Sequence, residues 1–494
     1  MSLVSIHNLN FTYPGRYDPV FAHADAQLDT RWKLGLTGRN GRGKTTLLHL
    51  LDGSLDAGGA IAGAPGGGYF PGAVPDFGLP LGEAAATLCD APDWQIAREL
   101  GKLGLPPEKL AQPFGSLSPG EQTRALLAVL FLQPGAWPLI DEPTNHLDDA
   151  GRALLGRYLK SQKNGFLLIS HDRALLDACC DHMLAIERTG LRLRQGNFSS
   201  WWQEVQDRDA REAAENERLG REIDRLQAAG QRATRWADKI EASKFSTRNS
   251  GLRVDRGYVG HKSAKMMQRA KAVEARRDKA IAEKQALFRD RERVDPLRLD
   301  PLPAPRGVLL RAADLSLYRG AQAVCGPLRF TLQAGDRLAL TGPNGCGKTT
   351  LLRLVAGEDI AHTGTLERPG SLVLSVVAQH SAPHGSVEAY AAEAGVDLTR
   401  LLTLLRKFGL ERVQFEAPVE SWSEGQRKKL ALARSLCQRA HIYLWDEPLN
   451  YIDLYARMQI EAMLRESGAT LLFVEHDRAF RQVVATGEVD LARV

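Results

Sequence analysis

The stretch "GRNGRGKTTLL" at residues 38–48 returns almost unchanged as "GPNGCGKTTLL" at residues 342–352, and this pair decides the fold. Three further motifs recur in the same order, each about 305 residues later. "LSPGEQ" is matched by "WSEGQ", "LIDEPTNHLD" by "LWDEPLNYID", and "LLISHDRA" by "LLFVEHDRA". Four motifs that keep both order and spacing indicate a duplicated domain.

Composition places the chain among folded proteins of several domains. It has 494 residues, of which 44% are hydrophobic and 25% charged, and its net charge of +5 is a mild bias. The six cysteines show no metal-ligand spacing, so we expect reduced thiols. The chain opens without a targeting pattern, and no apolar run approaches the ~20 residues that span a bilayer. These features predict a cytoplasmic protein with no membrane partner.

Each repeat contains G-x-x-x-x-G-K-T, the pattern of a phosphate-binding loop. Backbone N–H groups of such a loop point at phosphate oxygens, the lysine neutralises the outer phosphates, and the first threonine binds Mg²⁺. Apolar residues precede both loops, as expected of a buried strand that leads into a helix. We therefore predict ATP at Gly38, Asn40, Gly41, Gly43, Lys44, Thr45 and Thr46, and at Gly342, Asn344, Gly345, Gly347, Lys348, Thr349 and Thr350.

An Asp-Glu pair ends a later apolar strand in each repeat. The aspartate can hold the Mg²⁺ shell, and the glutamate can act as general base on the attacking water. A histidine at the end of the next strand can hydrogen-bond the terminal phosphate. Any one of these matches would be weak evidence, but all of them occur in order and twice. The predicted residues are Asp141, Glu142 and His171 in the first repeat and Asp446, Glu447 and His476 in the second.

Ser118 and Ser423 each precede a helical run, and the free N–H groups of a helix start suit a phosphate. The phosphate-binding loop already fills that role, so a second anion-binding helix start implies a second face. Here the sequence resembles the ATP-binding cassette ATPases, whose signature motif acts across a dimer interface. The resemblance implies an α/β fold in which two P-loop cassettes of one monomeric chain close head to tail on two ATP molecules.

The same resemblance assigns residues to two composite sites. Lys44, Asp141, Glu142 and His171 would face Ser423, Gly425 and Gln426, while Lys348, Asp446, Glu447 and His476 would face Ser118 and Gly120. Adenine would stack on Tyr13 and Tyr318, and the Mg²⁺ ligands, direct or through water, would be Thr45, Asp141, Thr349, Gln379 and Asp446.

Two positions depart from the cassette pattern. Pro119 stands where the family usually has glycine, which removes one N–H donor at a helix position that tolerates proline. Gly72 stands where a glutamine amide would reach Mg²⁺, whereas the second repeat has Gln379. We expect the two sites to be unequal.

The segment between the repeats concentrates positive charge. Residues 203–243 and 262–293 are rich in Glu, Arg, Ala, Lys and Gln, which predicts two long helices joined by a glycine-containing tip. Residues 231–279 carry 14 Lys and Arg against 5 Asp and Glu. A charge run is usually a solvated helix face, which remains our interpretation for the outer helices. At the tip, aromatic residues among cations are typical of RNA contacts, and the candidates are Lys244, Arg256, Tyr258, His261, Lys262 and Lys265.

This layout resembles the ABC-F family: tandem cassettes without a membrane domain, joined by a charged antiparallel helical hairpin that enters the ribosome. "KFSTRNSGLRVDRGYVGHKSAKMM" and "WDEPLNYID" are similar to its Lsa-type branch. The absence of an arm between Gly72 and Ser118, and a chain end soon after His476, also fit that branch. The expected domains are 1–202, 203–304 with a tip at about 244–262, and 305–494.

The resemblance implies an ATPase that inserts its linker toward the P-site tRNA and the peptidyl-transferase centre. Its partners would be rRNA and P-site tRNA, and it would protect the ribosome from lincosamide, streptogramin A and pleuromutilin antibiotics. A housekeeping ABC-F translation factor is the first alternative. The tandem ATPase subunit of a transporter is less favoured because it needs no basic hairpin. A DNA-repair ATPase would carry its coil inside a cassette, whereas here the first cassette is complete before the helices begin.

Overall fold

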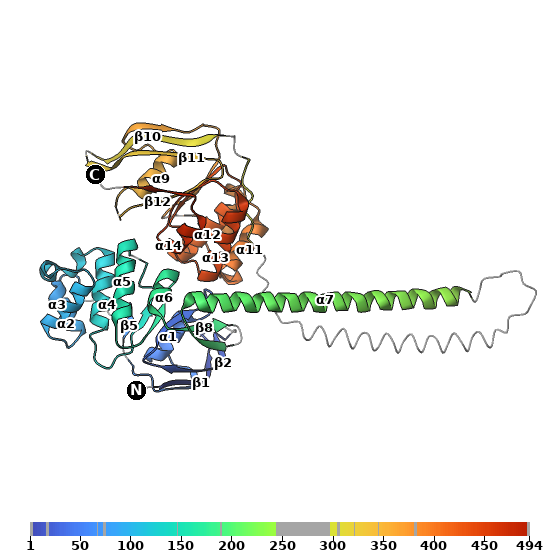
Figure 1. Ribbon diagram of the computed structural model, residues 1–494, viewed down its shortest axis with the longest axis horizontal. Helices are drawn as coiled ribbons and strands as arrows, with labels where there is room; N and C mark the ends of the chain where they lie inside the picture. Colours follow the sequence, from blue (N-terminus) through green and yellow to red (C-terminus); the bar gives the residue numbers. More distant parts are fainter. Residues whose placement is uncertain are drawn as a thin grey trace, which may run out of the picture. The chain divides into compact units, whose positions relative to one another are not determined.

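The computed structural model describes most of both repeats and the beginning of the segment between them (Figure 1). It divides into two compact units, one made of Met1–Trp201 with Asp295–Val494 and the other of Trp202–Val294. The described residues are 3–15, 19–66, 68–72, 76–145, 147–187, 190–243, 297–303, 307–320, 322–343, 345–379 and 383–491, with backbone only at 226–227 and 229–243.

A six-stranded sheet in the order β5-β6-β7-β3-β8-β9 forms the centre of the first repeat. Its neighbouring strands are parallel except for the last pair, β8 and β9. A separate antiparallel sheet has the order β2-β1-β4. The strands are β1 (Leu3–Phe11), β2 (Phe21–Asp29), β3 (Lys33–Thr37), β4 (Gly58–Ala62), β5 (Tyr69–Phe70), β6 (Leu139–Asp141), β7 (Phe166–Ile169), β8 (His182–Glu187) and β9 (Gly190–Gln195).

The helices of the first repeat follow the order that the motifs predict. One helix begins at the lysine of the phosphate-binding loop, and another begins directly after Ser118. The bounds are α1 (Lys44–Asp52), α2 (Leu81–Leu88), α3 (Asp93–Lys102), α4 (Pro119–Leu130), α5 (Asp149–Ser161) and α6 (Arg173–Cys179), with short 3₁₀ turns at Pro107–Ala111 and Phe114–Ser116.

The second repeat has the same plan, with a fully parallel sheet in the order β14-β15-β16-β12-β17 and an antiparallel sheet in the order β11-β10-β13. Its strands are β10 (Val308–Arg319), β11 (Gln322–Gln333), β12 (Arg337–Thr341), β13 (His362–Glu367), β14 (Leu374–Val377), β15 (Ile442–Asp446), β16 (Leu471–Val474) and β17 (Gly487–Asp490). Its helices are α9 (Lys348–Ala356), α10 (Val387–Glu393), α11 (Leu398–Lys407), α12 (Glu424–Cys437), α13 (Leu454–Ser467) and α14 (Arg478–Val484), with 3₁₀ turns at Arg412–Glu416 and Val419–Ser421.

Burial explains why the central strands form where the sequence predicts them. Every residue of β7, β15 and β16 is buried, which is the pattern of parallel strands covered on both faces. The carboxyl ends of β6 and β15 carry Asp141 and Asp446, beside the ends of β7 and β16. The parallel sheets therefore place the acidic pair of each repeat next to its histidine, as predicted.

Gly43 shows why the phosphate-binding loop requires glycine. Its φ of 86° lies in the left-handed region, and a Cβ atom there would lie 2.4 Å from Cγ1 of Val20. Helix α1 begins at the next residue, so the loop turns tightly between strand β3 and the helix. The predicted order of strand, loop and helix is confirmed.

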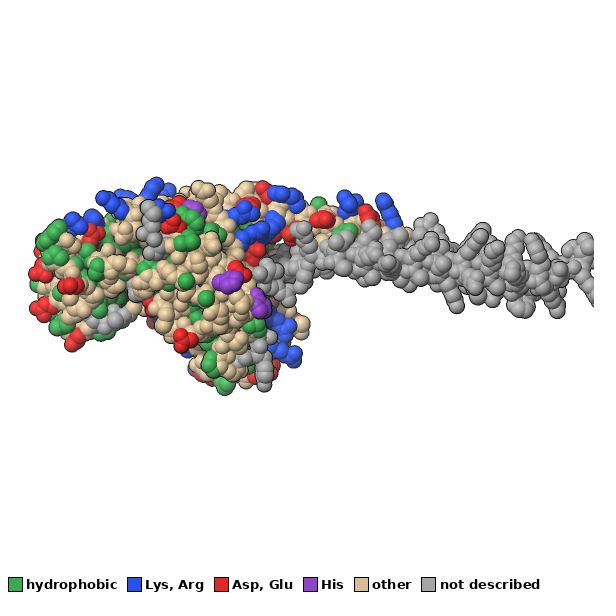
Figure 2. Space-filling model, turned by 90° about the horizontal axis from the view of Figure 1, so that it is seen from below, with side chains coloured by type: hydrophobic (Ala, Val, Ile, Leu, Met, Phe, Trp, Pro, Cys, Tyr) green, Lys and Arg blue, Asp and Glu red, His purple; other side chains and the backbone are tan. Residues whose placement is uncertain are grey.

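Helix α7 (Phe198–Ser243) is the first of the two predicted linker helices. Along its described side chains, Arg alternates with Asp and Glu (Figure 2), and ion pairs such as Arg218 with Glu222 lie on exposed surface. This agrees with a solvated helix face. The predicted return helix, the tip and its six candidate residues lie outside the described residues, so the hairpin and the predicted domain bounds stay predictions. Within the described part of the chain, no helix is both long and apolar enough to cross a membrane.

Candidate ATP site between the two repeats

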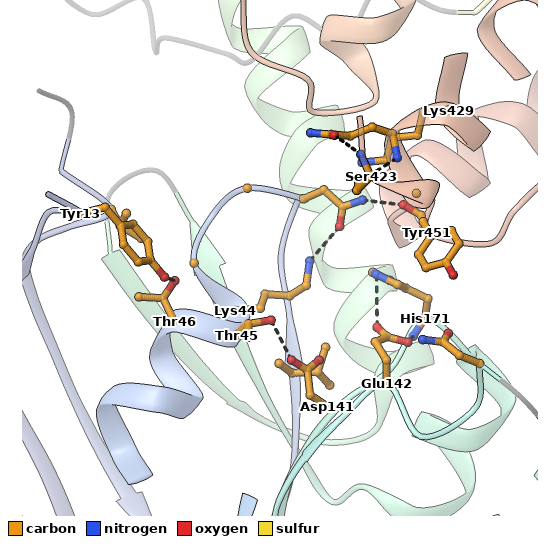
Figure 3. Close-up of a pocket in the computed structure, with 18 residues that line it drawn as sticks. Tyr13, Lys44, Thr45, Thr46, Asp141, Glu142, His171, Ser423, Lys429 and Tyr451 are labelled. Atoms are coloured by element: carbon orange, nitrogen blue, oxygen red, sulfur yellow. Dashed lines mark hydrogen bonds and ion pairs between the residues drawn. The ribbon is translucent and has the colours of Figure 1, made fainter. Parts of the chain in front are cut away.

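A cavity of about 750 Å³ lies between the phosphate-binding loop of the first repeat and the start of α12 of the second (Figure 3). The structure thus brings together residues that are far apart in the sequence, as the cassette resemblance implies for this site. The lining residues are Tyr13, Val20, Asn40, Gly41, Gly43, Lys44, Thr45, Thr46, Asp141, Glu142, Asn145, Ile169, His171, Ser423, Gly425, Gln426, Lys429 and Tyr451.

Lys44 is a buried cation whose acceptors are mostly backbone carbonyls of its own loop. Its Nζ donates to the Gly38 carbonyl at 2.8 Å and to Asn40 Oδ1 at 3.3 Å, and burial lowers its pKa. In the second repeat, Lys348 Nζ donates to the carbonyls of Gly342 and Pro343, at 2.7 and 3.0 Å. Carbonyl oxygens offset a buried ammonium charge only in part, so each lysine fits an anionic phosphate as a further partner.

The acidic side of the cavity offers oxygen ligands. Thr45 Oγ1 donates to Asp141 Oδ2 at 2.7 Å, and burial raises the pKa of Asp141. In the second repeat both carboxylate oxygens of Asp446 are buried without a hydrogen-bond partner among the described residues, and burial raises its pKa. Mg²⁺ prefers carboxylate and hydroxyl oxygens together with water. These donors therefore fit Mg²⁺.

Glu142 and His171 are close to each other beside this cavity. Their Oε1 and Nε2 atoms are 3.2 Å apart. Burial raises the pKa of Glu142 to about 7, and burial lowers the pKa of His171 well below its usual value, so this histidine is neutral. A glutamate with a raised pKa is matched to accepting a proton near neutral pH.

The corresponding pair of the second repeat is charged. His476 Nε2 is 3.4 Å from Glu447 Oε1, and its Nδ1 is 3.4 Å from Asp149 Oδ1 of the first repeat. Burial alone would lower the pKa of His476, but hydrogen bonds to Asp149 and Glu447 raise it to about 9. Burial likewise opposes ionisation of Glu447, but His476 and Asn450 lower its pKa to about 2. The two repeats hold their glutamates in different charge states.

The helix start at Ser423 is built to present N–H groups to the first cavity. Ser423 Oγ accepts from the Gln426 backbone at 3.3 Å, and the Ser423 N–H donates to Gln426 Oε1 at 2.8 Å. Ser118 caps α4 in the same way with Glu121. Because the capping pairs satisfy one another, the remaining N–H groups of the first turn are available to an anion.

The second cavity is smaller, and its described lining does not reproduce the first. It measures about 300 Å³ and is lined by Asp148, Asp149, Ala150, Leu340, Thr341, Gly342, Pro343, Lys348, Glu475, His476 and Arg481. Ser118, Gly120, Asp446 and Glu447 are not among these residues. The carboxylate of Asp149 occupies the first repeat's side of this cavity, paired with Arg481 at 2.5 Å. The described lining of this cavity therefore does not combine Lys348 with the start of α4.

The remaining predicted site residues do not all line a cavity. Tyr13 lines the first cavity, with its hydroxyl 2.8 Å from Thr46 Oγ1. Tyr318 lies on β10 and is not part of the described lining of the second cavity. Gln379 is exposed just after β14, and its carbonyl accepts from Lys428 at 3.3 Å. Pro119 occupies the first position of α4, where its missing N–H is tolerated. Asn344 lies outside the described residues.

Contacts between the repeats were not predicted from the sequence. The Asn40 N–H donates to Asp453 Oδ2 at 3.1 Å, and Arg457 Nη1 donates to the His171 carbonyl at 3.0 Å. The buried side chains of Arg173 and Glu461 form a bidentate ion pair, with Nη1 to Oε2 at 3.1 Å. Of the second-cassette partners in these contacts, only Asp453 gave a signal in the sequence, because it ends the repeated motif "LWDEPLNYID".

Lys428 was also missed, because a lysine in a helix is normally interpreted as solvent-facing. It is buried, and its Nζ donates to the Ala378 carbonyl at 2.8 Å and to the Asp446 carbonyl at 2.6 Å. It thereby ties α12 to the ends of β14 and β15. The first repeat has Thr123 at the matching position.

A phosphate-binding loop that meets the signature helix of a second, similar domain defines an ATP-binding cassette protein, here with both cassettes in one chain. A family model described as "ABC transporter" matches residues 325–450. This domain family consists of ATPases, so nucleotide binding with Mg²⁺ and ATP hydrolysis are its general properties.

Curated relatives match nearly the whole chain. The ribosome protection protein VmlR of Bacillus subtilis is 28% identical over 477 residues, which is 95% of this chain and 84% of that protein. The tylosin resistance ATP-binding protein TlrC of Streptomyces fradiae is 27% identical over 560 residues, covering 99% and 97%. The probable ATP-binding protein YheS of Escherichia coli K12 is 29% identical over 506 residues, covering 92% and 74%. Over nearly its whole length the chain is therefore similar to ATP-binding proteins of the ABC-F family.

Solved structures share the fold across both cassettes. The RNase-L Inhibitor gives a TM-score of 0.59 at 18% identity, covering 97% of this chain and 86% of that one. The archaeal ribosome recycling factor aABCE1, in complex with the ribosomal stalk protein aP1, gives 0.58 at 19% identity with the same coverage. At these identities the likeness concerns the fold alone.

Replacing Glu461 by alanine should destabilise the pairing of the cassettes. Among the described residues, the ion pair left to Arg173 would be the one with Asp477, at 3.9 Å. Loss of one partner from a buried ion pair costs roughly 3–5 kcal/mol. We expect the thermal unfolding midpoint to fall by about 5 °C or more. Scanning fluorimetry measures this, with Glu358→Ala as control because its partner Arg353 is exposed. Equal midpoints for the two variants would contradict the assigned role of the pair.

Proposed function

We propose that this chain is a ribosome-associated ATPase that protects the ribosome from lincosamide, streptogramin A and pleuromutilin antibiotics. The observation that carries the proposal is the first cavity, where the cation, carboxylates and signature helix of an ATPase come from both cassettes. The resemblance to a ribosome protection protein over 95% of the chain supports the ribosome as partner.

In the proposed hydrolysis the residues of the first cavity have distinct roles. Lys44 and the start of α12 bind the phosphates from opposite cassettes, while Thr45 and Asp141 hold Mg²⁺, whose bound charge offsets that of the phosphates. Glu142 orients water and accepts its proton. The neutral His171 reports on the terminal phosphate through its contact with Glu142, since its 3.2 Å distance couples the two side chains.

The linker is proposed to act on RNA, and the cassettes to control its insertion. Closure of both cassettes on ATP would hold the linker near the P-site tRNA and the peptidyl-transferase centre, and hydrolysis would release it. The candidate tip residues combine cations with an aromatic ring, which suits phosphate contact and base stacking. A housekeeping translation factor of the same family would bind ribosomes equally well but would not protect them from drugs.

The double variant Glu142→Gln with Glu447→Gln should bind ATP but not hydrolyse it. Loss of both general bases stops the chemical step while leaving the lysines and helix starts intact, so the protein should remain on ribosomes and inhibit growth. Phosphate release and sucrose-gradient sedimentation measure the two effects. As a control, Lys44→Ala with Lys348→Ala should neither hydrolyse ATP nor stay with ribosomes. Wild-type turnover in the glutamine variant would refute the assignment of the bases.

Tyr258→Ala should reduce drug protection without changing basal ATPase activity. Stacking of a base on an aromatic ring is worth roughly 1–3 kcal/mol, so protection should fall by about fivefold or more. A panel of lincosamides and pleuromutilins in a deletion strain measures this, and Tyr258→Phe, which keeps the ring, should still protect. Full protection by a folded, ribosome-bound Tyr258→Ala protein would sink the idea.

Two further variants separate stacking from other causes. Lys262→Ala should instead weaken ribosome association and flatten its salt dependence, since it removes about one phosphate contact. If Tyr258 only packs between linker helices, its loss should speed proteolysis of the free protein. An unchanged cleavage rate therefore supports a lost RNA contact.

A further inference from the structure

The carboxylate of Asp141, at the end of β6, is held by two hydroxyl groups, whereas the carboxylate of its counterpart Asp446 has no hydrogen-bond partner among the described residues. Thr45 Oγ1 donates to Asp141 Oδ2 at 2.7 Å, and the Tyr69 hydroxyl donates to the same oxygen at 3.5 Å. In the described part of the chain, Oδ1 of Asp141 has no donor. Two donors on one oxygen restrict rotation of the carboxylate and leave its other oxygen available.

The sheet explains why Tyr69 reaches this carboxylate. In the parallel pair of β5 and β6, Tyr69 is in register with Leu139, and Asp141 lies two residues beyond Leu139. Side chains two residues apart on a strand point to the same face, so the tyrosine, the leucine and the aspartate share one face. The Tyr69 ring also contacts His49 of α1, with ring centroids 4.6 Å apart. Strand register and ring packing together aim the hydroxyl at Asp141.

At the position of Gly72, the first cassette has no room for the glutamine whose amide would reach Mg²⁺. A Cβ atom at Gly72 would lie 2.5 Å from the Tyr69 carbonyl oxygen, a distance that Cβ atoms essentially never adopt. Because this oxygen belongs to the backbone, it cannot easily move away. The turn after β5 therefore excludes every side chain at this position, glutamine included. The departure at Gly72 is thus built into the same short segment that carries Tyr69.

The second cassette has the reverse arrangement. Val376 occupies the position of Tyr69, since it pairs with Leu444 as Tyr69 pairs with Leu139. Valine brings no hydroxyl to Asp446. Gln379 follows three residues later, at the distance that separates Gly72 from Tyr69. Of these two matched positions, each cassette therefore has a polar side chain at one, but at a different one.

We propose that Tyr69 is a positioning residue for Mg²⁺ at the first ATP site, where its hydroxyl orients Asp141 and takes the place of the glutamine amide that the sequence predicts at the second site, from Gln379. This inference rests on the proposed ATP hydrolysis and concerns the metal geometry of the same site. Partners that orient a metal-binding carboxylate commonly tune metal affinity without touching the ion.

The test measures metal dependence separately from nucleotide affinity. In a Lys348→Ala background, which disables the second site, Mg²⁺ is titrated against binding of a fluorescent ATP analogue to the full-length chain. Tyr69→Phe removes only the hydroxyl and keeps the ring on His49. We expect the half-saturating Mg²⁺ concentration to rise roughly threefold to tenfold, as for loss of one hydrogen bond, with unchanged binding in EDTA.

Controls make the outcome specific. Tyr158→Phe removes a phenolic oxygen from a buried ring of the same cassette, packed on Phe131, and should leave the Mg²⁺ titration unchanged. In the opposite background, Lys44→Ala, the further substitution Gln379→Ala should raise the half-saturating Mg²⁺ concentration at the second site, whereas Tyr69→Phe should leave it unchanged.

Three results overturn the proposal. An unchanged titration for Tyr69→Phe shows that the hydroxyl does not orient Asp141. An equal loss of binding with and without Mg²⁺ shows that Tyr69 only packs the site. If the Lys348→Ala parent binds no nucleotide at all, the proposed ATP site itself fails and this inference fails with it.

Discussion

Buried charges from both cassettes meet beside the first ATP site, and the completeness of that site depends on them. Arg457 of α13 donates to the carbonyl of His171, and Arg173 of α6 pairs with Glu461. A buried guanidinium is costly unless it is paired and hydrogen-bonded. These side chains therefore stabilise only the arrangement in which the two cassettes are in contact. That arrangement also places Ser423 opposite Lys44. The same contacts therefore determine both the pairing of the cassettes and the shape of the cavity.

The two candidate ATP sites differ because their histidines contact different groups at the interface between the cassettes. At the first site His171 is neutral, and its carbonyl is bound by the second cassette. At the second, Asp149 of the first cassette draws His476 into a charged contact with Glu447. A carboxylate beside a phosphate-binding cavity repels a triphosphate, so occupation of the second site requires Asp149 to move away. The two sites therefore differ in the charge of their histidines as well as in the residues that line their cavities.

The sequence predicted the parts of the fold and site that local chemistry dictates. Gly43 must adopt positive φ, and Lys44, Asp141 and Glu142 follow from motif spacing on parallel strands. The sequence did not reveal pairs such as Arg173 with Glu461, because the partner of a long charged side chain depends on how two domains pack. Tyr69 gave no signal either, since an aromatic residue in a short strand normally belongs to the core. The stacking role assigned to Tyr318 has no support from the described lining of the second cavity.

Vanadate-directed photocleavage tests most directly whether both cassettes build the first site. Orthovanadate with MgADP takes the place of the terminal phosphate, and ultraviolet light then cuts the backbone beside it. In the Lys348→Ala protein the account predicts cuts both in the loop at residues 38–45 and at the start of α12, near Ser423 and Gly425, which line the same cavity. Cleavage confined to the loop, with α12 intact, would contradict a site shared between the cassettes.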